Sequence, residues 1–305
     1  MKAFVAGATG VLGRRVVPLL VAAGHEVSAL ARSDTRAAMV TGLGASPVRA
    51  DLFDPESVRR AVAGHEVVCN LATHIPTTAR ITRPGAWAEN DRIRTEGSRN
   101  LVDAVLDGGV ARYVQESIAL LYRDGGNAWL DESSPIDAVA NLRSATVAES
   151  HAARVSAGGA TGVVLRFAIF YGPDSESTLA MIRLARRRIA LGAGPDRSMS
   201  SITTDDAATA VVASLSAPAG LYNVGDDEPV TGREFFGALA GALGVRPPFI
   251  APAGLARLGG SMAAAVTRSQ RVSNRAFVEA TGWKPEHRSV RDGWPAVVAA
   301  TVAAT

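Results

Sequence analysis

The stretch Gly7-Ala8-Thr9-Gly10-Val11-Leu12-Gly13 decides the fold of this chain. It follows the apolar residues 2–6, which predict a short buried strand, and it leads into a helix predicted from about Val11 to Ala23. Glycines in such a turn permit a tight bend and let backbone amides approach a pyrophosphate at the helix N-terminus. The sequence therefore predicts a dinucleotide site whose contacts are Gly7, Thr9, Gly10, Val11, Leu12 and Gly13.

The strand-then-helix pattern recurs through the first half of the chain. The tetrapeptide Gly-His-Glu-Val even stands at two of the junctions, at 24–27 and at 64–67. Further strands are predicted at 26–30, 66–71, 113–117 and 162–170, and further helices at 55–63, 95–106 and 144–157. Such alternation predicts a parallel sheet with right-handed crossovers, covered on both faces. The predicted fold class is α/β, a Rossmann-type doubly wound sheet.

The regular alternation weakens after Tyr171-Gly172-Pro173. We therefore expect a dinucleotide-binding Rossmann domain over residues 1–170. Residues 171–305 are expected to form a smaller, mainly substrate-binding part, with some segments returning to the Rossmann sheet. The Ala- and Gly-rich stretch 252–266 lacks a basic face, so an ordinary packed helix is expected there rather than a membrane-surface helix.

Composition and charge restrict the class of protein. Of the 305 residues, 47% are hydrophobic and 20% charged, and 32 basic against 29 acidic residues leave a formal charge of only +3, which does not imply a nucleic-acid partner. The single cysteine, Cys69, excludes a disulfide within the chain. No apolar run has the length of a membrane span, and no signal peptide is predicted, because the N-terminal apolar stretch breaks at Gly7. We expect a cytoplasmic protein.

The end of the second strand indicates which dinucleotide is bound. A site that prefers NAD places an acidic residue there to hold the ribose hydroxyls. This chain has Ala31 followed by Arg32, and a guanidinium would attract the 2′-phosphate of NADP(H). NADP(H) is therefore the predicted cofactor, with Ser33 and Arg36 as helpers; the alternative is that Arg32 is only a surface residue.

Other cofactor contacts are predicted at the ends of later strands. Asp51 and Leu52 would border the adenine, and the stretch Leu71-Ala72-Thr73 would pass beneath the ribose and the nicotinamide. Phe167 and Ile169, in the strand predicted at 162–170, complete the predicted set.

With these motifs the chain resembles the extended short-chain dehydrogenase/reductase family, which includes nucleotide-sugar epimerases and many reductases. The resemblance runs nearly from end to end. Its further motifs are Leu165-Arg166 leading to Tyr171-Gly172-Pro173, Thr204-Asp205-Asp206-Ala207, and Tyr222-Asn223-Val224-Gly225. It implies an NAD(P)-dependent enzyme that acts as a monomer or as a homodimer formed through helices at about 95–106 and 144–157.

The residues that carry the family's chemistry are missing. The family uses a Tyr followed four residues later by Lys, commonly with a Glu another four residues on. Glu149 sets this register, which places Ala145 at the position of the Lys and Asn141 at that of the Tyr. By the same kind of counting, Ile118 takes the place of the family's Ser or Thr, and Arg94 that of its Asn. The resemblance is therefore to an atypical member.

Four residues remain as catalytic candidates near the nicotinamide, namely Ser117, Tyr122, Asn141 and His74. Ser117 would take the hydroxyl role if the register slipped by one residue. For His74 the alternative is a hydrogen bond to a loop carbonyl, without a role in catalysis. The five histidines show no paired spacing with Cys or carboxylates, so no metal site is predicted.

Reduction of a ketone requires a proton on oxygen as well as a hydride on carbon, and general acid catalysis contributes roughly a hundredfold to ten-thousandfold. A substrate with an acidic hydroxyl beside its ketone could replace the missing acid. In this pattern the chain resembles some atypical reductases of the family, which act on angucyclinone-like rings in antibiotic pathways. We therefore expect an NADPH-dependent ketoreductase for a large aromatic, polyketide-like ketone, with substrate-assisted proton transfer.

Two other functions stay open at this point. The first is a non-catalytic NADP(H)-binding redox sensor or regulator that binds a protein partner. The second is a sugar epimerase or dehydratase, which is the weaker hypothesis because those reactions also use the missing Tyr.

Overall fold

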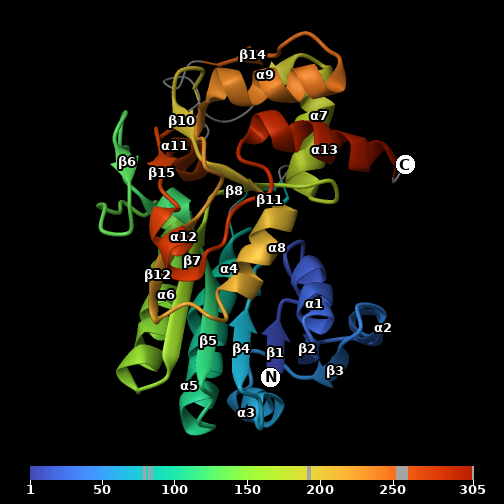
Figure 1. Ribbon diagram of the computed structural model, residues 1–305, viewed down its shortest axis with the longest axis vertical. Helices are drawn as coiled ribbons and strands as arrows, with labels where there is room; N and C mark the ends of the chain where they lie inside the picture. The colour runs from blue at the N-terminus through green and yellow to red at the C-terminus, as the bar shows by residue number, and fades with distance from the viewer. Residues whose placement is uncertain (78–79, 82, 84, 191–193, 252–259, 304–305) are drawn as a thin grey trace.

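The computed structural model describes residues 1–77, 80–81, 83, 85–190, 194–251 and 260–303 (Figure 1). Within these residues a parallel sheet forms the centre of the molecule, helices cover both of its faces, and the C-terminal half of the chain packs across one end. None of the helices described is long and apolar enough to cross a bilayer.

The central sheet has seven parallel strands in the order β12-β7-β5-β4-β1-β2-β3. The strands are β1 (Lys2–Ala6), β2 (Glu26–Ala31), β3 (Ser46–Arg49), β4 (Val67–Asn70), β5 (Arg112–Ile118), β7 (Thr161–Phe167) and β12 (Gly220–Val224). From β1 the chain adds strands first on one side and then, beginning with β4, on the other. The order therefore reverses between β1 and β4, and in open α/β sheets ligands bind in the crevice at this point. The predicted doubly wound sheet is confirmed.

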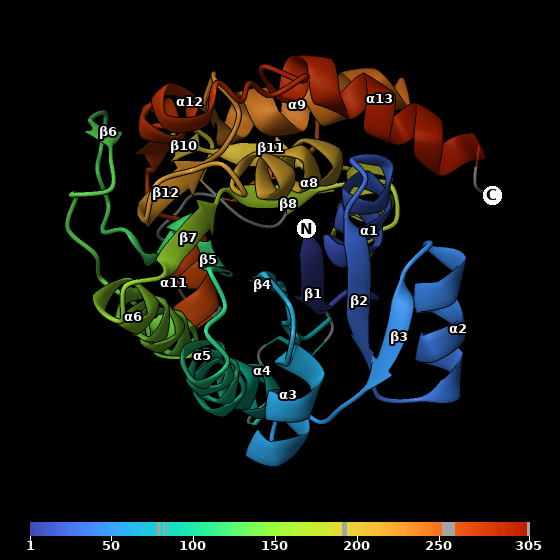
Figure 2. The same cartoon turned by 60° about the horizontal axis from the view of Figure 1, so that its bottom comes forward.

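Helices pack on both faces of the sheet, each face with its own apolar core (Figure 2). One core involves α1 (Gly13–Ala22), α2 (Asp34–Gly42), α8 (Thr204–Ala213) and α12 (Arg275–Thr281). The other involves α3 (Pro55–Val62), α5 (Ser98–Asp107) and α6 (Arg143–Ala157). The strands β1, β4, β5 and β7 are therefore buried on both sides, as expected of central parallel strands.

Three predicted elements differ from the structure by more than one residue at an end. The first helix begins at Gly13 rather than Val11, because the residues before it form a turn in which the Gly10 N–H donates to the Gly7 carbonyl. The helix predicted at 95–106 is the last part of a longer helical run, made of α4 (Ala88–Arg92), a π-helical turn η1 (Ile93–Gly97) and α5.

The third difference lies in the strand predicted at 162–170, which is broken. At Ala168 the backbone N–H donates to Val224 of β12, and at Ile169 it donates to Ser200 instead. The chain therefore leaves the central sheet after Phe167 and continues as β8 (Ile169–Tyr171), paired with β11 (Ser201–Thr203).

The C-terminal half builds a second, smaller layer. Its helices α7 (Glu176–Arg186), α9 (Gly232–Leu243) and α13 (Val290–Ala303) surround an aromatic core in which Tyr171, Phe235 and Trp294 are in ring contact. Short strand pairs complete this layer: β9 (Ile189–Ala190) with β14 (Phe249–Ile250), β10 (Ser198–Met199) with β13 (Val230–Thr231), and β6 (Trp129–Leu130) with β15 (Arg271–Val272). Of the helix predicted within 252–266, residues 252–259 lie outside the described residues, and α11 (Ser261–Val266) is helical.

Candidate cofactor-binding and active site

Two glycines make the β1–α1 turn possible. Gly7 has a φ of +88°, and a Cβ atom on it would lie 2.5 Å from the backbone carbon of Leu71 at the end of β4. A Cβ on Gly13 would lie 2.2 Å from the Gly7 carbonyl oxygen. Only residues without a side chain allow the turn to fold back this tightly between β1 and β4.

The same turn presents unused donors. Among the described residues, the backbone N–H groups of Val11 and Leu12 have no hydrogen-bond acceptor, and the first turn of α1 contains no acidic residue. Free amides at the positive end of a helix dipole suit an anion such as a pyrophosphate. The residues present here therefore fit a dinucleotide.

Basic residues gather where β2 ends. Ser33 caps α2 by accepting a hydrogen bond from the Arg36 amide, and the Arg36 guanidinium reaches Thr9 of the glycine turn at 3.4 Å. Arg49 donates to the carbonyl oxygen of Arg32 at 3.2 Å. Three guanidinium groups thus surround the turn after β2, a position at which the sequence predicts Arg32, Ser33 and Arg36 to hold a phosphate.

The other predicted cofactor contacts lie at the carboxyl ends of their strands. Leu71 and Ala72 are buried after β4, while Thr73 beside them is exposed. Asp51 accepts a hydrogen bond from the Phe53 amide and is exposed, and Leu52 is buried next to it. Of the two residues that complete the predicted set of cofactor contacts, Phe167 is part of the core and Ile169 is half-buried.

Ion pairs connect the cofactor turn with the C-terminal half. Arg15 of α1 contacts Asp174, which follows β8, at 2.8 Å and Asp205, in the first turn of α8, at 2.6 Å. Arg14 also reaches Asp174, at 3.0 Å. These contacts hold the two halves of the chain together beside the helix end that would bind the pyrophosphate.

Two of the predicted catalytic hydroxyls meet at one buried ion pair. Glu149 of α6 forms two hydrogen bonds with Arg166 of β7, at 2.8 and 2.7 Å. The fully buried Ser117 donates to Glu149 at 2.6 Å, and the Arg166 guanidinium lies 5.0 Å from the centre of the Tyr122 ring. The Tyr122 hydroxyl donates to the side-chain oxygen of Asn223 at 2.7 Å. Both hydroxyl protons are therefore already donated to protein acceptors.

The environment of Tyr122 also makes it a weaker acid. Its ring is fully buried, and burial raises the pKa of Tyr122, while Arg166 and Asn223 oppose that rise only in part. Burial disfavours the phenolate that would remain after proton transfer. Tyr122 is therefore poorly suited to release a proton to a substrate.

A second buried ion pair lies beside the first. Arg94, which is 3% exposed, projects from the π-helical turn and forms two hydrogen bonds with Glu116 of β5, at 3.0 and 2.9 Å. Burial raises the pKa of Glu116, Arg94 lowers it, and the charge of Glu149 adds to the rise. The sequence analysis did not identify this pair. The sequence signal for this pair is the glutamate itself, because a glutamate within a buried strand requires a cationic partner.

The remaining catalytic candidates lie apart from these pairs. His74 is exposed; its amide donates to Asn90 of α4 at 3.0 Å, and its ring nitrogen Nε2 lies 3.9 Å from Glu89. Asn141 is half-buried in the short 3-10 helix Ala140–Leu142. Ala145 is fully buried in the first turns of α6, so the position matching the family's Lys carries no polar group.

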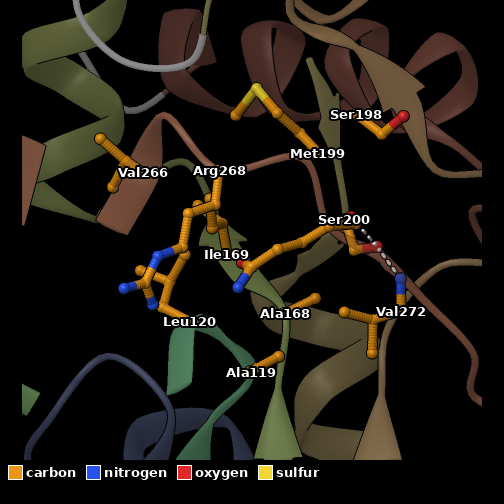
Figure 3. Close-up of a pocket in the computed structure, with 11 residues that line it drawn as sticks. Ala119, Leu120, Ala168, Ile169, Ser198, Met199, Ser200, Val266, Arg268 and Val272 are labelled. Carbon is orange, nitrogen blue, oxygen red and sulfur yellow. Dashed lines mark hydrogen bonds between the residues drawn. The ribbon is translucent and has the colours of Figure 1, made fainter. Parts of the chain in front are cut away.

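A recess lies between the loop after β5 and the C-terminal half (Figure 3). Leu120, Ile169, Met199 and Val266 give it apolar walls. Arg268 also lines it, and the guanidinium donates to the Tyr122 carbonyl at 3.0 Å and to Asp137 at 2.6 Å. Its cavity measures about 10 Å³, room for about one water molecule. The recess is therefore too small to hold an aromatic ring.

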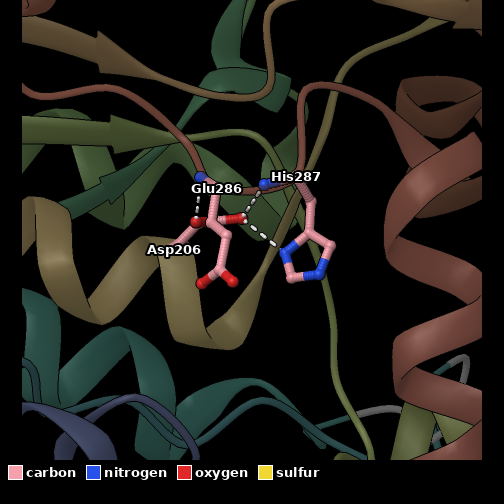
Figure 4. Close-up of side chains that lie close together, drawn as sticks. All are labelled: Asp206, Glu286 and His287. Carbon is pink, nitrogen blue, oxygen red and sulfur yellow. Dashed lines mark hydrogen bonds and ion pairs between the residues drawn. The ribbon is translucent and has the colours of Figure 1, made fainter.

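Three potential metal ligands come together in the C-terminal half, namely Asp206, Glu286 and His287 (Figure 4). Asp206 accepts hydrogen bonds from the amides of Glu286 and His287, at 2.7 and 3.2 Å, from the His287 ring at 3.2 Å, and from the Thr203 hydroxyl at 2.8 Å. Both carboxylate oxygens are thus occupied. The cluster fastens the segment before α13 to α8.

Comparison with protein families agrees with the cofactor site. A model of the NAD(P)H-binding family matches residues 7–218. A "3-diazoavenalumate denitrifying reductase" from a Streptomyces species is 37% identical over 96% of this chain and 99% of its own. A 4-hydroxy-2-methyl-3-oxo-4-farnesyl-3,4-dihydroquinoline-1-oxide ketoreductase from Stigmatella aurantiaca is 30% identical over 86% of this chain and 80% of its own.

Solved structures share the fold. A human epimerase family protein with NADPH has a TM-score of 0.83 at 22% identity and covers 98% of this chain and 99% of its own. The UDP-glucose 4-epimerase of Thermus thermophilus in complex with NAD has a TM-score of 0.80 at 24% identity, with both chains fully covered.

Proposed function

The chain belongs to the NAD(P)H-binding family, and from this premise we propose that it is an NADPH-dependent reductase of an aromatic substrate that needs no proton from the protein. One observation carries this proposal. Asn141 and the buried Ala145 stand at the positions that the sequence register assigns to the family's Tyr and Lys, while the hydroxyls of Ser117 and Tyr122 donate to protein acceptors, Glu149 and Asn223.

The choice of NADPH over NADH rests on charge. Arg32 follows the end of β2, where a site for NADH would have a carboxylate for the ribose hydroxyls, and Arg36 lies in the first turn of α2. The carboxylate of Asp34, two residues after Arg32, is turned to solvent and pairs with Arg49. A phosphate at this turn would be met by guanidinium groups, which bind phosphate through paired, charge-assisted hydrogen bonds.

When bound, NADPH supplies a hydride. The chain's own contribution is to bind and orient, because bringing the reacting groups together provides a rate gain that does not depend on a general acid. The remaining requirement for a ketone is a proton on the alkoxide oxygen. A hydroxyl beside the ketone, as in polyphenolic aromatic rings, would supply that proton from within the substrate.

A second candidate reaction is favoured by the relative that is 37% identical, whose name is that of a denitrifying reductase of a diazo compound. When a hydride adds to an aromatic diazonium compound, the hydride supplies both electrons of the new C–H bond, and N₂ leaves with the electrons of the broken C–N bond. That reaction requires no proton. It therefore fits a site without the Tyr and Lys as well as the ketone reduction does.

The test is NADPH oxidation at 340 nm with three substrate panels. The first contains hydroxylated polycyclic ketones, the second their methyl ethers, and the third aromatic diazo compounds with N₂ release as a further readout. Turnover of the first panel but not the second supports substrate-assisted ketone reduction, and turnover with N₂ release in the third supports the second reaction. Rapid turnover of the methyl ethers would contradict the proposal, because those compounds cannot donate the proton.

If no panel gives NADPH oxidation although NADPH still binds, the result would instead favour the non-catalytic NADP(H)-binding redox sensor or regulator. The reductase names of the two relatives support an enzyme over that alternative. The epimerase hypothesis would need product from nucleotide sugars, and its reaction would require a base at the positions of Asn141 and Ala145.

A further inference from the structure

We propose that Glu89 competes with the 2′-phosphate of NADP(H) for Arg32 and thereby speeds the release of NADP⁺. This inference rests on the proposed preference for NADPH. Its starting point is an ion pair across the site. Arg32 Nη1 lies 3.5 Å from Glu89 Oε1, and the other oxygen of the same carboxylate lies 3.9 Å from the ring of His74.

The sheet order shows where this carboxylate lies. Arg32 follows β2 and His74 follows β4, and β1 with its glycine turn stands between these two strands. Glu89 comes from a third element, α4, whose next residue, Asn90, holds the backbone of His74. Glu89 thus contacts one residue after β2 and one after β4, the two strands that flank β1. Its carboxylate therefore lies beside the crevice at the carboxyl end of β1, where the dinucleotide is expected.

The pair is weak enough to exchange. The side chains of Arg32 and Glu89 are 41% and 43% exposed, and their 3.5 Å separation is long for a charge-assisted hydrogen bond. Exposed pairs of this kind contribute about 0.2–1 kcal/mol, which corresponds to a change of about 1.4-fold to fivefold in affinity. A phosphate dianion would displace the carboxylate, and the carboxylate would remain nearby as a repelling charge.

The consequence differs between the two cofactors. NADP(H) must take Arg32 from Glu89, whereas NAD(H) has no group that needs this guanidinium. Glu89 would therefore lower the affinity for NADPH and NADP⁺ without changing that for NADH. Because release of product limits turnover in many enzymes, a competitor within the site would keep the oxidised cofactor from remaining bound.

The experiment compares the full wild-type chain with Glu89→Gln. NADPH, NADH and adenosine 2′,5′-bisphosphate, which carries the phosphate without a nicotinamide, are titrated by fluorescence or calorimetry, and NADP⁺ dissociation is followed by stopped flow. In the variant, we expect NADPH and the bisphosphate to bind about 1.4-fold to fivefold more tightly, NADP⁺ to leave more slowly by the same factor, and NADH to bind as before. The difference should shrink at high salt, where exposed charges are screened.

Glu96→Gln is the matched control. Glu96 follows Glu89 on the same helical run and also pairs with an arginine, Arg92, but not with Arg32. It should leave all affinities unchanged. Glu89→Asp, which keeps the charge on a shorter side chain, should lie between wild type and Glu89→Gln and provides a second variant if Glu89→Gln folds poorly.

Unchanged affinity for the bisphosphate in Glu89→Gln, or an equal gain for NADH, would overturn the competition. Failure of the proposed NADPH preference gives a different result. Wild type would then bind NADH as tightly as NADPH, and Arg32→Ala would alter neither affinity.

Discussion

Two regions of the molecule differ in how their polar groups are used. The cofactor end consists of the glycine turn Gly7–Gly13 and Arg32. The β5–α6 edge consists of Ser117, Glu149 and Arg166. At the cofactor end, backbone amides lack acceptors among the described residues and the guanidinium is half-exposed. At the β5–α6 edge, every one of the three side chains is bonded to another within the protein. The first region is arranged to receive a ligand, and the second is arranged to hold the fold.

The difference shows that binding and proton donation are separable in this fold. The first depends on backbone geometry and charge at the β1–α1 turn. The second depends on the side chains at two positions, Asn141 just before α6 and Ala145 on α6, and the sheet and the glycine turn form although neither position carries a phenol or an ammonium group. Substitutions in the two regions test this division.

Glu149→Gln should have the largest effect, on stability. It would leave the buried guanidinium of Arg166 without its counter-ion, and removing one partner of a buried pair costs about 3–5 kcal/mol. Urea unfolding measures this loss. Asp103→Asn, which breaks the exposed pair with Arg154, is the control and should cost less than about 1 kcal/mol. Equal losses for the two variants would mean that the β5–α6 edge is not held by its ion pair.

Gly7→Ala should destabilise the cofactor end by about 2–4 kcal/mol, from a left-handed backbone and a Cβ forced against Leu71. It should also weaken NADPH binding, because the turn must move. Gly24→Ala separates the two causes, since Gly24 has a φ of +80° but open space around its Cβ position. It should lose only about 1–2 kcal/mol, from the backbone alone. Chemical unfolding with and without NADPH gives both quantities.

Arg32→Ala should weaken NADPH binding by about 10-fold to 150-fold, the equivalent of about 1.5–3 kcal/mol for hydrogen bonds to a charged group. The affinity for NADH should stay the same, because NADH carries no 2′-phosphate. Titration of both cofactors measures the two values. An equal loss for NADH would show that Arg32 supports the fold of the turn rather than recognising a phosphate.

Ser117→Ala and Tyr122→Phe should have the smallest effect, on turnover. If the substrate provides the proton or needs none, kcat should change less than about threefold, far below the hundredfold expected on losing a general acid. Tyr122→Phe is expected to lose more stability than Ser117→Ala. It leaves the buried side-chain oxygen of Asn223 without its donor, whereas Glu149 keeps its hydrogen bonds from Arg166 in Ser117→Ala. A hundredfold loss of kcat in a variant that folds normally would identify that hydroxyl as the proton donor.

Local sequence patterns were enough to predict the parallel sheet, the glycine turn and the family, and they predict that Asn141 and Ala145 stand where the family has its Tyr and Lys. These follow from local patterns: apolar runs, glycines and a fixed spacing within one helix. The sequence also indicated Arg32, Ser33 and Arg36 as neighbours, because they follow one strand directly.

Only the tertiary structure decided what the remaining polar groups contact. Arg94 and Glu116 lie 22 residues apart in the chain and Ser117 and Glu149 lie 32 apart, so no local spacing could pair them. No local spacing could pair Arg32 with Glu89 either. Arg32 follows β2 and Glu89 comes after β4 in the chain, and the sheet order places these two strands on either side of β1. Buried charges must find partners, but which partner each one finds depends on the packing of helices against the sheet.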